Sequence, residues 1–164
     1  MREFGLRYIE AKPHYQWPLR TATLQRGWET NVSVQALMKK LRVFLVEDNP
    51  IILLNLTQAL EELAGVQVVG SAADESTALK WLDGRTNGCD VVILDIFLLS
   101  GSGLGVLRGM QTYEAPPYRV VLTNYTSPEI RDKCYGLGAQ ATFDKSKELD
   151  ELISWLTLTG GTLH

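Results

Sequence analysis

Five side chains that can carry or offset charge stand directly after short apolar segments of this sequence. They are Glu47 and Asp48, then Asp95, Thr123 and Lys145. If the apolar segments are parallel strands, the five residues meet at the sheet edge where ligands of open parallel sheets bind. Like charges that lie close together repel unless a cation binds between them, and carboxylate oxygens with partial hydration suit Mg²⁺. The residue types therefore predict a Mg²⁺ site at this edge.

Asp95 is the member of this set that is hardest to explain as a purely structural residue. It directly follows the apolar run 91–94, and a carboxylate beside a buried strand carries a desolvation cost unless a charged group compensates it. Asp48 alone would be explained as a helix cap, and Lys145 alone as a solvated side chain. The joint occurrence of the five residues is therefore what predicts a site.

Strand-like and helix-like segments alternate five times from residue 41 onward. The expected strands cover residues 41–46, 66–70, 91–95, 119–123 and 139–144. Asn49 before Pro50 and Ser127 before Pro128 are expected helix N-caps, and Ser146 is the expected N-cap of the last helix. This alternation predicts an α/β fold in which helices cover both faces of a parallel sheet.

Composition and charge limit the class of protein. Of 164 residues, 45% are hydrophobic and 21% are charged, which is typical of a globular domain with one core. The apolar runs are far shorter than the roughly 20 residues of a membrane span, so no membrane partner is expected. Cys89 and Cys134 are too few for a disulfide framework, and we interpret them as small buried residues. No secretory signal pattern is present, which favours a cytoplasmic location.

The net charge of −3 is unevenly distributed along the chain. Residues 1–40 hold seven Lys or Arg and three Asp or Glu, which leaves residues 41–164 with a net charge of −7. An acidic domain of this kind is not expected to bind nucleic acid. The basic residues 1–37 have two interpretations: they are an arm that grips a partner, or they are an extension upstream of a true start at Met38.

Short motifs at the ends of the expected strands form a set that is specific to one family. The motifs are Val46-Glu47-Asp48-Asn49, Ile93-Leu94-Asp95 with Gly103 eight residues on, Leu122-Thr123, Gly138-Ala139, and Phe143-Asp144-Lys145-Ser146. Over residues 38–158 the sequence resembles the receiver domain of two-component response regulators, and the last motif is similar to that of a subgroup of stand-alone receivers. The resemblance implies a flavodoxin-like, doubly wound (βα)5 fold with strand order 2-1-3-4-5.

The resemblance also implies a role for each residue of the site. Asp95 would accept a phosphoryl group from a phosphohistidine on a sensor histidine kinase or a histidine phosphotransfer protein. The expected Mg²⁺ ligands are Glu47, Asp48, Asp95 and the main-chain carbonyl of Phe97. The expected phosphate-binding and switch residues are Thr123, Asn124 and Lys145. Such a protein is a phosphoacceptor and not a turnover enzyme.

Two departures from the family pattern concern the peptide after Lys145 and the signalling aromatic residue. The family usually has a cis proline where this chain has Ser146, so we expect a trans peptide, because a non-proline cis peptide costs roughly 2.5–4 kcal/mol. The usual aromatic residue is replaced by Thr142, and the ring of Phe143 should face the opposite side of the strand. Either Tyr125, two residues beyond Thr123, substitutes for the missing aromatic residue, or phosphorylation is read out differently.

Phe97 and Tyr125 also stand at the two variable positions that flank the attacking water in this family. Both are bulky rings, which predicts that water is excluded and that the phosphoryl group is long-lived.

Domain boundaries and two competing functions complete the sequence-based expectations. We assign residues 1–37 to an extension, 38–158 to the receiver domain and 159–164 to a tail. We expect output by docking to an unidentified protein and not through a C-terminal effector domain. An aspartyl phosphatase-like hydrolase would need a second carboxylate where this chain has Phe97. A receiver-like module that binds partners without phosphorylation is the other alternative.

Overall fold

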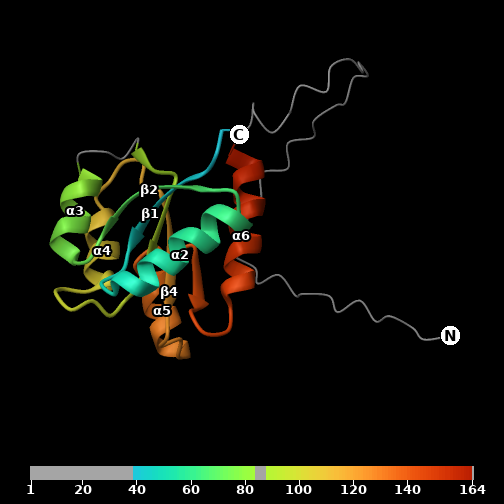
Figure 1. The fold of residues 1–164 in the computed structure, drawn as a ribbon. Coiled ribbons are helices and arrows are strands. Elements are labelled where there is room, and N and C mark those ends of the chain that lie inside the picture. The colour runs from blue at the N-terminus through green and yellow to red at the C-terminus, as the bar shows by residue number, and fades with distance from the viewer. Residues whose placement is uncertain (1–38, 84–87, 164) are drawn as a thin grey trace, which may run out of the picture. The chain divides into compact units, whose positions relative to one another are not determined.

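The apolar segments of the sequence form one five-stranded parallel sheet (Figure 1). The computed structural model describes residues 39–83 and 88–163. The strands are β1 (Arg42–Val46), β2 (Gln67–Ala72), β3 (Val91–Leu94), β4 (Tyr118–Thr123) and β5 (Ala141–Asp144). Their order is β2-β1-β3-β4-β5, and every neighbouring pair is parallel. This order confirms the flavodoxin-like fold predicted from the sequence.

Helices cover both faces of the sheet (Figure 1). They are α2 (Pro50–Leu63), α3 (Glu75–Asp83), α4 (Gly103–Met110), α5 (Pro128–Gly136) and α6 (Leu149–Leu163). Buried side chains of α3, α4 and α5 form the core on one face, and those of α2 and α6 form the core on the other. All four residues of β3 are buried because both faces of this central strand are covered.

Two of the three predicted N-caps are correct and the third is wrong. The Asn49 side chain accepts the amides of Ile51 and Ile52 at 3.0 and 3.2 Å, and Ser127 caps α5. Ser146 does not cap α6, which begins three residues later. Its amide and hydroxyl instead donate to the Asp144 carboxylate at 2.8 and 2.5 Å, because an Asp side chain readily accepts the amide two residues on.

The end of the chain also differs from the prediction. Helix α6 continues to Leu163, so residues 159–163 of the expected tail are helical. Thr159 is buried, and the hydroxyls of Thr157 and Thr162 donate to carbonyls of the helix. The expected extension at residues 1–37 lies outside the described residues. Within the described part of the chain, no helix has the length and apolarity needed to cross a bilayer.

Candidate functional site

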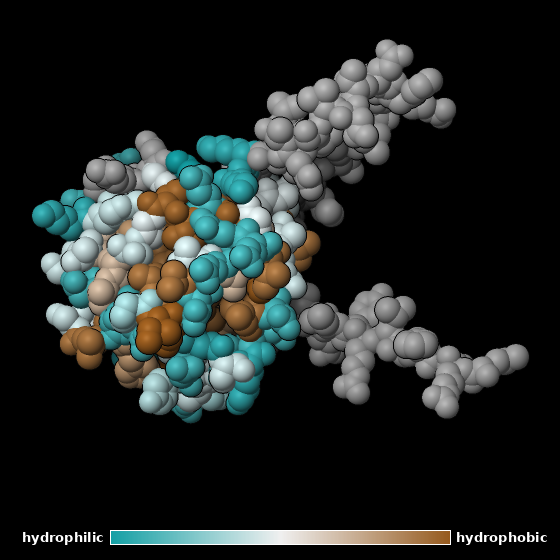
Figure 2. Space-filling model, viewed as in Figure 1, coloured by the Kyte–Doolittle hydropathy of each residue, from teal (hydrophilic) through white to brown (hydrophobic). Residues whose placement is uncertain are grey.

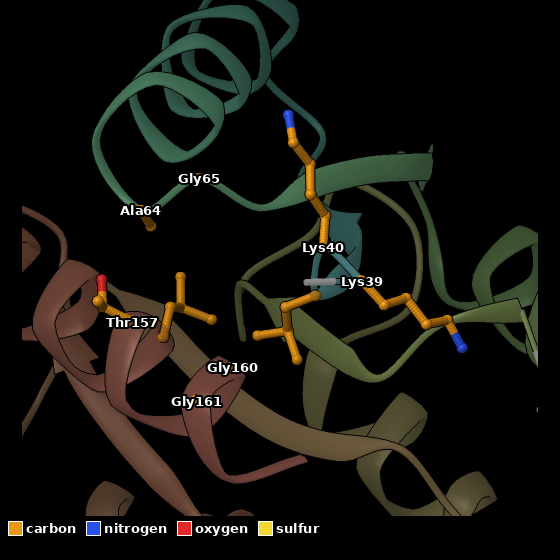
Figure 3. A pocket seen from close by; sticks show the side chains of 9 residues that line it. Lys39, Lys40, Ala64, Gly65, Thr157, Gly160 and Gly161 are labelled. Atoms are coloured by element: carbon orange, nitrogen blue, oxygen red, sulfur yellow. The ribbon is translucent and has the colours of Figure 1, made fainter. Parts of the chain in front are cut away.

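The carboxyl ends of β1, β3, β4 and β5 meet at one edge of the sheet. Aligned pairs near these ends are Val46 with Leu94 and Thr123 with Asp144. The residues that end each strand or follow it, including Glu47, Asp95 and Lys145, are thereby brought to the same edge. A pocket of about 580 Å³ lies beyond the opposite, amino-terminal end of β1 (Figure 3). None of the predicted site residues lines that pocket.

Lys145 joins two of the predicted carboxylates directly. Its ammonium donates to Glu47 Oε2 and to Asp95 Oδ2, each at 2.5 Å. The three side chains are buried to a similar degree, with exposed fractions of 10% for Lys145, 4% for Glu47 and 11% for Asp95. Burial alone would lower the pKa of the Lys145 ammonium, but its hydrogen bonds to Asp95 and Glu47 outweigh burial and raise this pKa. Lys145 is therefore charged at neutral pH.

Asp48 and Asp95 are both oriented by main-chain amides of the loop that follows β3. Asp48 Oδ2 accepts the Leu99 amide at 2.8 Å, and Asp95 Oδ1 accepts the Phe97 amide at 3.2 Å. In the described ranges, no three His, Cys, Asp or Glu side chains are grouped so that they could hold a metal ion. The chemistry of the donor set still fits Mg²⁺, because the three carboxylates supply only oxygen ligands. The Leu99 amide uses only Oδ2 of Asp48, and a carboxylate can bind a cation through its other oxygen.

Thr123 and Asn124 follow one another at the end of β4 but differ in exposure. Thr123 is fully buried, and its hydroxyl oxygen accepts the Tyr125 amide at 3.5 Å. Asn124 is exposed and lines, together with Lys145, a pocket of about 410 Å³. Helix α2 forms another wall of this pocket through Ile52, Asn55, Leu56 and Ala59. The pocket therefore opens beside the predicted phosphate-binding residues.

The rings of Phe97 and Tyr125 contact each other on the loops after β3 and β4. Their centroids are 4.7 Å apart with an interplanar angle of 61°, which is an edge-on contact. Phe97 is 51% exposed and Tyr125 is 61% exposed. The two positions predicted to flank the attacking water are thus adjacent and face solvent.

Thr142 and Phe143 point to opposite faces of β5, as the sequence predicts. Phe143 packs with the core on the α2 and α6 face. Thr142 is buried, and its hydroxyl has no hydrogen-bond partner within the described residues. The Lys145–Ser146 peptide is trans, again as predicted.

Sequence reasoning missed a polar network that fixes the loop carrying Lys145. Arg131 donates to the Thr142 carbonyl at 2.6 Å and pairs with Glu148 at 2.8 Å. Glu148 in turn accepts the Asp144 amide at 2.7 Å, and Asp144 accepts the Thr126 hydroxyl at 3.1 Å. These contacts join α5 to the loops after β4 and β5. The bonded residues are up to 18 positions apart, so no local sequence motif predicts these contacts.

Residues 43–157 match the family model of the response regulator receiver domain. The chain therefore belongs to the family of response regulator receiver domains. This assignment agrees with the fold, with the carboxylates at the ends of β1 and β3, and with the lysine after β5.

Two curated relatives and one solved structure illustrate the similarity. Response regulator UvrY of Escherichia coli strain K12 is 30% identical over 114 residues, which are 70% of this chain and 51% of UvrY. Transcriptional regulatory protein MctR of Rhizobium johnstonii is 32% identical over 124 residues, which are 74% of this chain and 56% of MctR. The chain thus spans about half the length of these relatives.

The solved structure is the signal receiver domain of the putative response regulator NarL from Mycobacterium tuberculosis. It has a TM-score of 0.67 and 24% identity, with 75% of this chain and 98% of that chain covered. A similarity at this level of identity supports the fold.

Proposed function

We propose that Asp95 accepts a phosphoryl group from the phosphohistidine of a sensor histidine kinase or a histidine phosphotransfer protein. The observation that carries this proposal is the Lys145 ammonium, which lies 2.5 Å from Asp95 Oδ2 at the sheet edge where β4 ends in Thr123. A cation held beside this carboxylate fixes its orientation and can offset the charge of an incoming phosphoryl group.

The transfer replaces a phosphorus–nitrogen bond by a phosphorus–oxygen bond. An Asp95 oxygen attacks the phosphorus atom, and the bond to the imidazole nitrogen breaks with its electron pair left on the ring. The Lys145 ammonium and the Thr123 hydroxyl then offset negative charge on the phosphoryl oxygens. Asn124, which follows Thr123, lines the 410 Å³ pocket together with Lys145.

The carboxylates fit a Mg²⁺ ion that would serve the same reaction. Asp48, Asp95 and the Phe97 carbonyl would bind it directly, and Glu47 would act mostly through water. Bound Mg²⁺ would offset charge on the transferring group. Asp48 could fill this role through Oδ1 while Oδ2 keeps the Leu99 amide.

We propose that the phosphorylated domain works by docking to proteins in the cytoplasm. Apolar side chains gather on the face over α2, and Ile51 and Leu54 of this helix are 70% and 58% exposed (Figure 2). The net charge of −7 on residues 41–164 disfavours contact of this domain with nucleic acid. The relative MctR is named a transcriptional regulatory protein, and this chain spans about half of it. Output by protein docking is therefore proposed for this chain alone.

Tyr125 is the proposed residue for reading out phosphorylation, because its amide contacts the Thr123 hydroxyl. A turn of this hydroxyl toward a phosphoryl group would release the amide and let the exposed Tyr125 ring, which Ala would remove, change position. Replacing Tyr125 by Ala should therefore weaken the phosphorylation-dependent change in partner binding. Unchanged partner binding by the variant would exclude Tyr125 as the readout.

Incubation with acetyl phosphate and MgCl₂, followed by intact-protein mass spectrometry, tests phosphoryl acceptance. We expect the mass gain of one phosphoryl group in the wild type and in D132N, which changes an exposed carboxylate on α5. D95N should show no gain. Absence of any gain in the wild type would favour a binding module that acts without phosphorylation, and continuous release of phosphate would favour a hydrolase.

A further inference from the structure

The loop between β3 and α4, residues 96–102, is held at several points beside Asp95. We call it the acceptor loop. Its Phe97 amide donates to Asp95 and its Leu99 amide donates to Asp48. Its two ends are joined by an antiparallel bridge between Phe97 and Ser102 and by the Gly103 amide, which donates to the Ile96 carbonyl at 3.0 Å. The position of Ser102 is therefore coupled to that of Phe97.

Glu75 at the start of α3 holds the far end of this loop. Its carboxylate Oε2 accepts the Ser102 amide at 2.8 Å. Its own amide donates to the Ser100 carbonyl at 3.3 Å. Glu75 is thus joined to this loop by one side-chain hydrogen bond, to a residue 27 positions away, and by one main-chain hydrogen bond. This carboxylate also lies at the N-terminus of α4, where negative charge is favourable.

Two glycines leave the space that the Glu75 side chain occupies. A Cβ atom added to Gly101 or Gly105 would overlap Glu75 atoms. Gly101 also has a φ of +75°, a conformation that other residues rarely adopt. At Gly105 the nearest atoms are all in the Glu75 carboxylate, so Ala at this position would displace the carboxylate without touching the acceptor loop directly.

We propose that Glu75 is a positioning residue for phosphoryl acceptance, which it serves by fixing the acceptor loop against Asp95. The coupling runs from the Glu75 carboxylate to the Ser102 amide, across the bridge to Phe97, and from the Phe97 amide to Asp95. Within the described residues, the hydrogen bonds of Glu75 reach Ser100 and Ser102 and not Asp95 itself. The proposal rests on the proposed function of Asp95 as the phosphoacceptor.

Four variants separate this role from a general contribution to stability. E75A removes the acceptor, E75Q keeps an acceptor oxygen of the same reach, and G105A displaces the carboxylate without removing it. The matched control is E61A, because Glu61 on α2 likewise accepts a main-chain amide from another element, that of Val68 at 3.0 Å. Among the described residues, the hydrogen bond of the Glu61 side chain goes to β2 and not to the acceptor loop.

Amide hydrogen exchange measured by NMR and the rate of phosphorylation by acetyl phosphate are the two readouts. We expect E75A and G105A to speed exchange at Phe97, Leu99 and Ser102 about threefold or more, and to slow phosphorylation by a similar factor. E75Q and E61A should resemble the wild type in both. Thermal unfolding checks that each variant is folded.

Loop exchange in E75A or G105A that matches the wild type or E61A would overturn the proposal. So would a normal phosphorylation rate in a variant whose loop exchanges faster. If the wild type itself accepts no phosphoryl group, the proposed function of Asp95 fails, and with it the proposed effect of Glu75 on the phosphorylation rate. The exchange data still decide whether Glu75 fixes the loop.

Discussion

At Lys145, one ammonium group lies between two carboxylates that would otherwise repel each other. All three side chains are largely buried, so an unpaired charge here would keep most of its desolvation cost. The raised pKa of Lys145 agrees with this pairing. The local chemistry of the site is therefore a balance of charge that a phosphoryl group would change by adding negative oxygens.

The ring contact between Phe97 and Tyr125 leads to a prediction about the lifetime of the phosphoryl group. Replacing both residues by Ser should speed autodephosphorylation by at least about threefold, because water would reach the phosphorus more easily. Decay of labelled phosphoprotein measures this rate. Leu158 on α6 is also exposed, and L158S serves as the control that should keep the wild-type rate. Unchanged decay in the double variant would contradict the shielding role.

Asp90 provides a pH prediction away from the site. It accepts the main-chain amide of Arg42 at 2.8 Å and pairs with the Arg42 guanidinium at 3.0 Å. Burial alone would raise the pKa of Asp90, but the Arg42 hydrogen bonds lower it below the ordinary value of 3.8. A lowered carboxyl pKa stabilises the folded state above that ordinary value, and this contribution is lost as the pH falls through the lowered pKa.

D90N should therefore lower the free energy of unfolding by about 1–2 kcal/mol at pH 7. Urea denaturation should show that the difference from the wild type shrinks below about pH 4, where the wild-type carboxyl also becomes neutral. A difference that stays constant down to the acid limit of folding would show that charge on Asp90 contributes nothing.

At the scale of the elements, the junction of β3 and α4 is closely packed against the main chain of Asp95. Gly103 begins α4 and lies directly on the main chain of Asp95. Ser102 caps the same helix by accepting the Gly105 amide at 3.0 Å, and Glu75 holds Ser102 from α3. The start of α4 thus joins the acceptor residue to a second helix.

G103A should disturb both stability and phosphorylation. Its Cβ atom would overlap the Asp95 carbonyl and the Leu94 side chain, and a main-chain neighbour cannot turn aside as a flexible side chain can. We expect a loss of about 1–3 kcal/mol in the free energy of unfolding, together with slower phosphorylation of Asp95. G136A is the control, because a Cβ atom there meets nothing within 4 Å and Ala favours the helix. Equal stability of the two variants would contradict the close packing.

At the scale of the whole molecule, two cores share one sheet whose carboxyl edge bears the site. Buried side chains of β1, β3 and β4 belong to both cores, so the strands that position the carboxylates are fixed from both faces. Cys89 and Cys134 are free and buried, as interpreted from the sequence. Burial raises the pKa of the Cys89 thiol to about 12, which keeps it protonated and unreactive at neutral pH. Because both cores pack on the strands that form the carboxyl edge, a ligand that binds there should stabilise the entire fold.

Mg²⁺ should raise the thermal midpoint of the wild type relative to the protein in EDTA. A tenfold excess over its Kd corresponds to about 1.4 kcal/mol, or roughly 3–8 °C for a domain of this size. Differential scanning fluorimetry should show this increase in D132N but not in D48N. An equal increase in D48N would mean that Mg²⁺ acts elsewhere on the acidic surface.

The sequence by itself determined the order of strands and helices, two of the helix caps and the residues at the carboxyl ends of the strands. These features depend on local periodicity, on capping preferences and on the apolar run before Asp95, all of which are readable within a few residues. The family motifs added the strand order. Ser146 was misassigned because its capping preference was satisfied by Asp144, two residues earlier.

Only the tertiary structure decided which of these residues touch. Lys145 and Glu47 are 98 positions apart, Asp48 and Leu99 are 51 apart, and Glu75 and Ser102 are 27 apart. Each pair forms because the sheet order and the helix packing bring distant segments together, and no local pattern encodes such a contact. The sharing of Lys145 by two carboxylates and the hold of Glu75 on the acceptor loop follow from that packing.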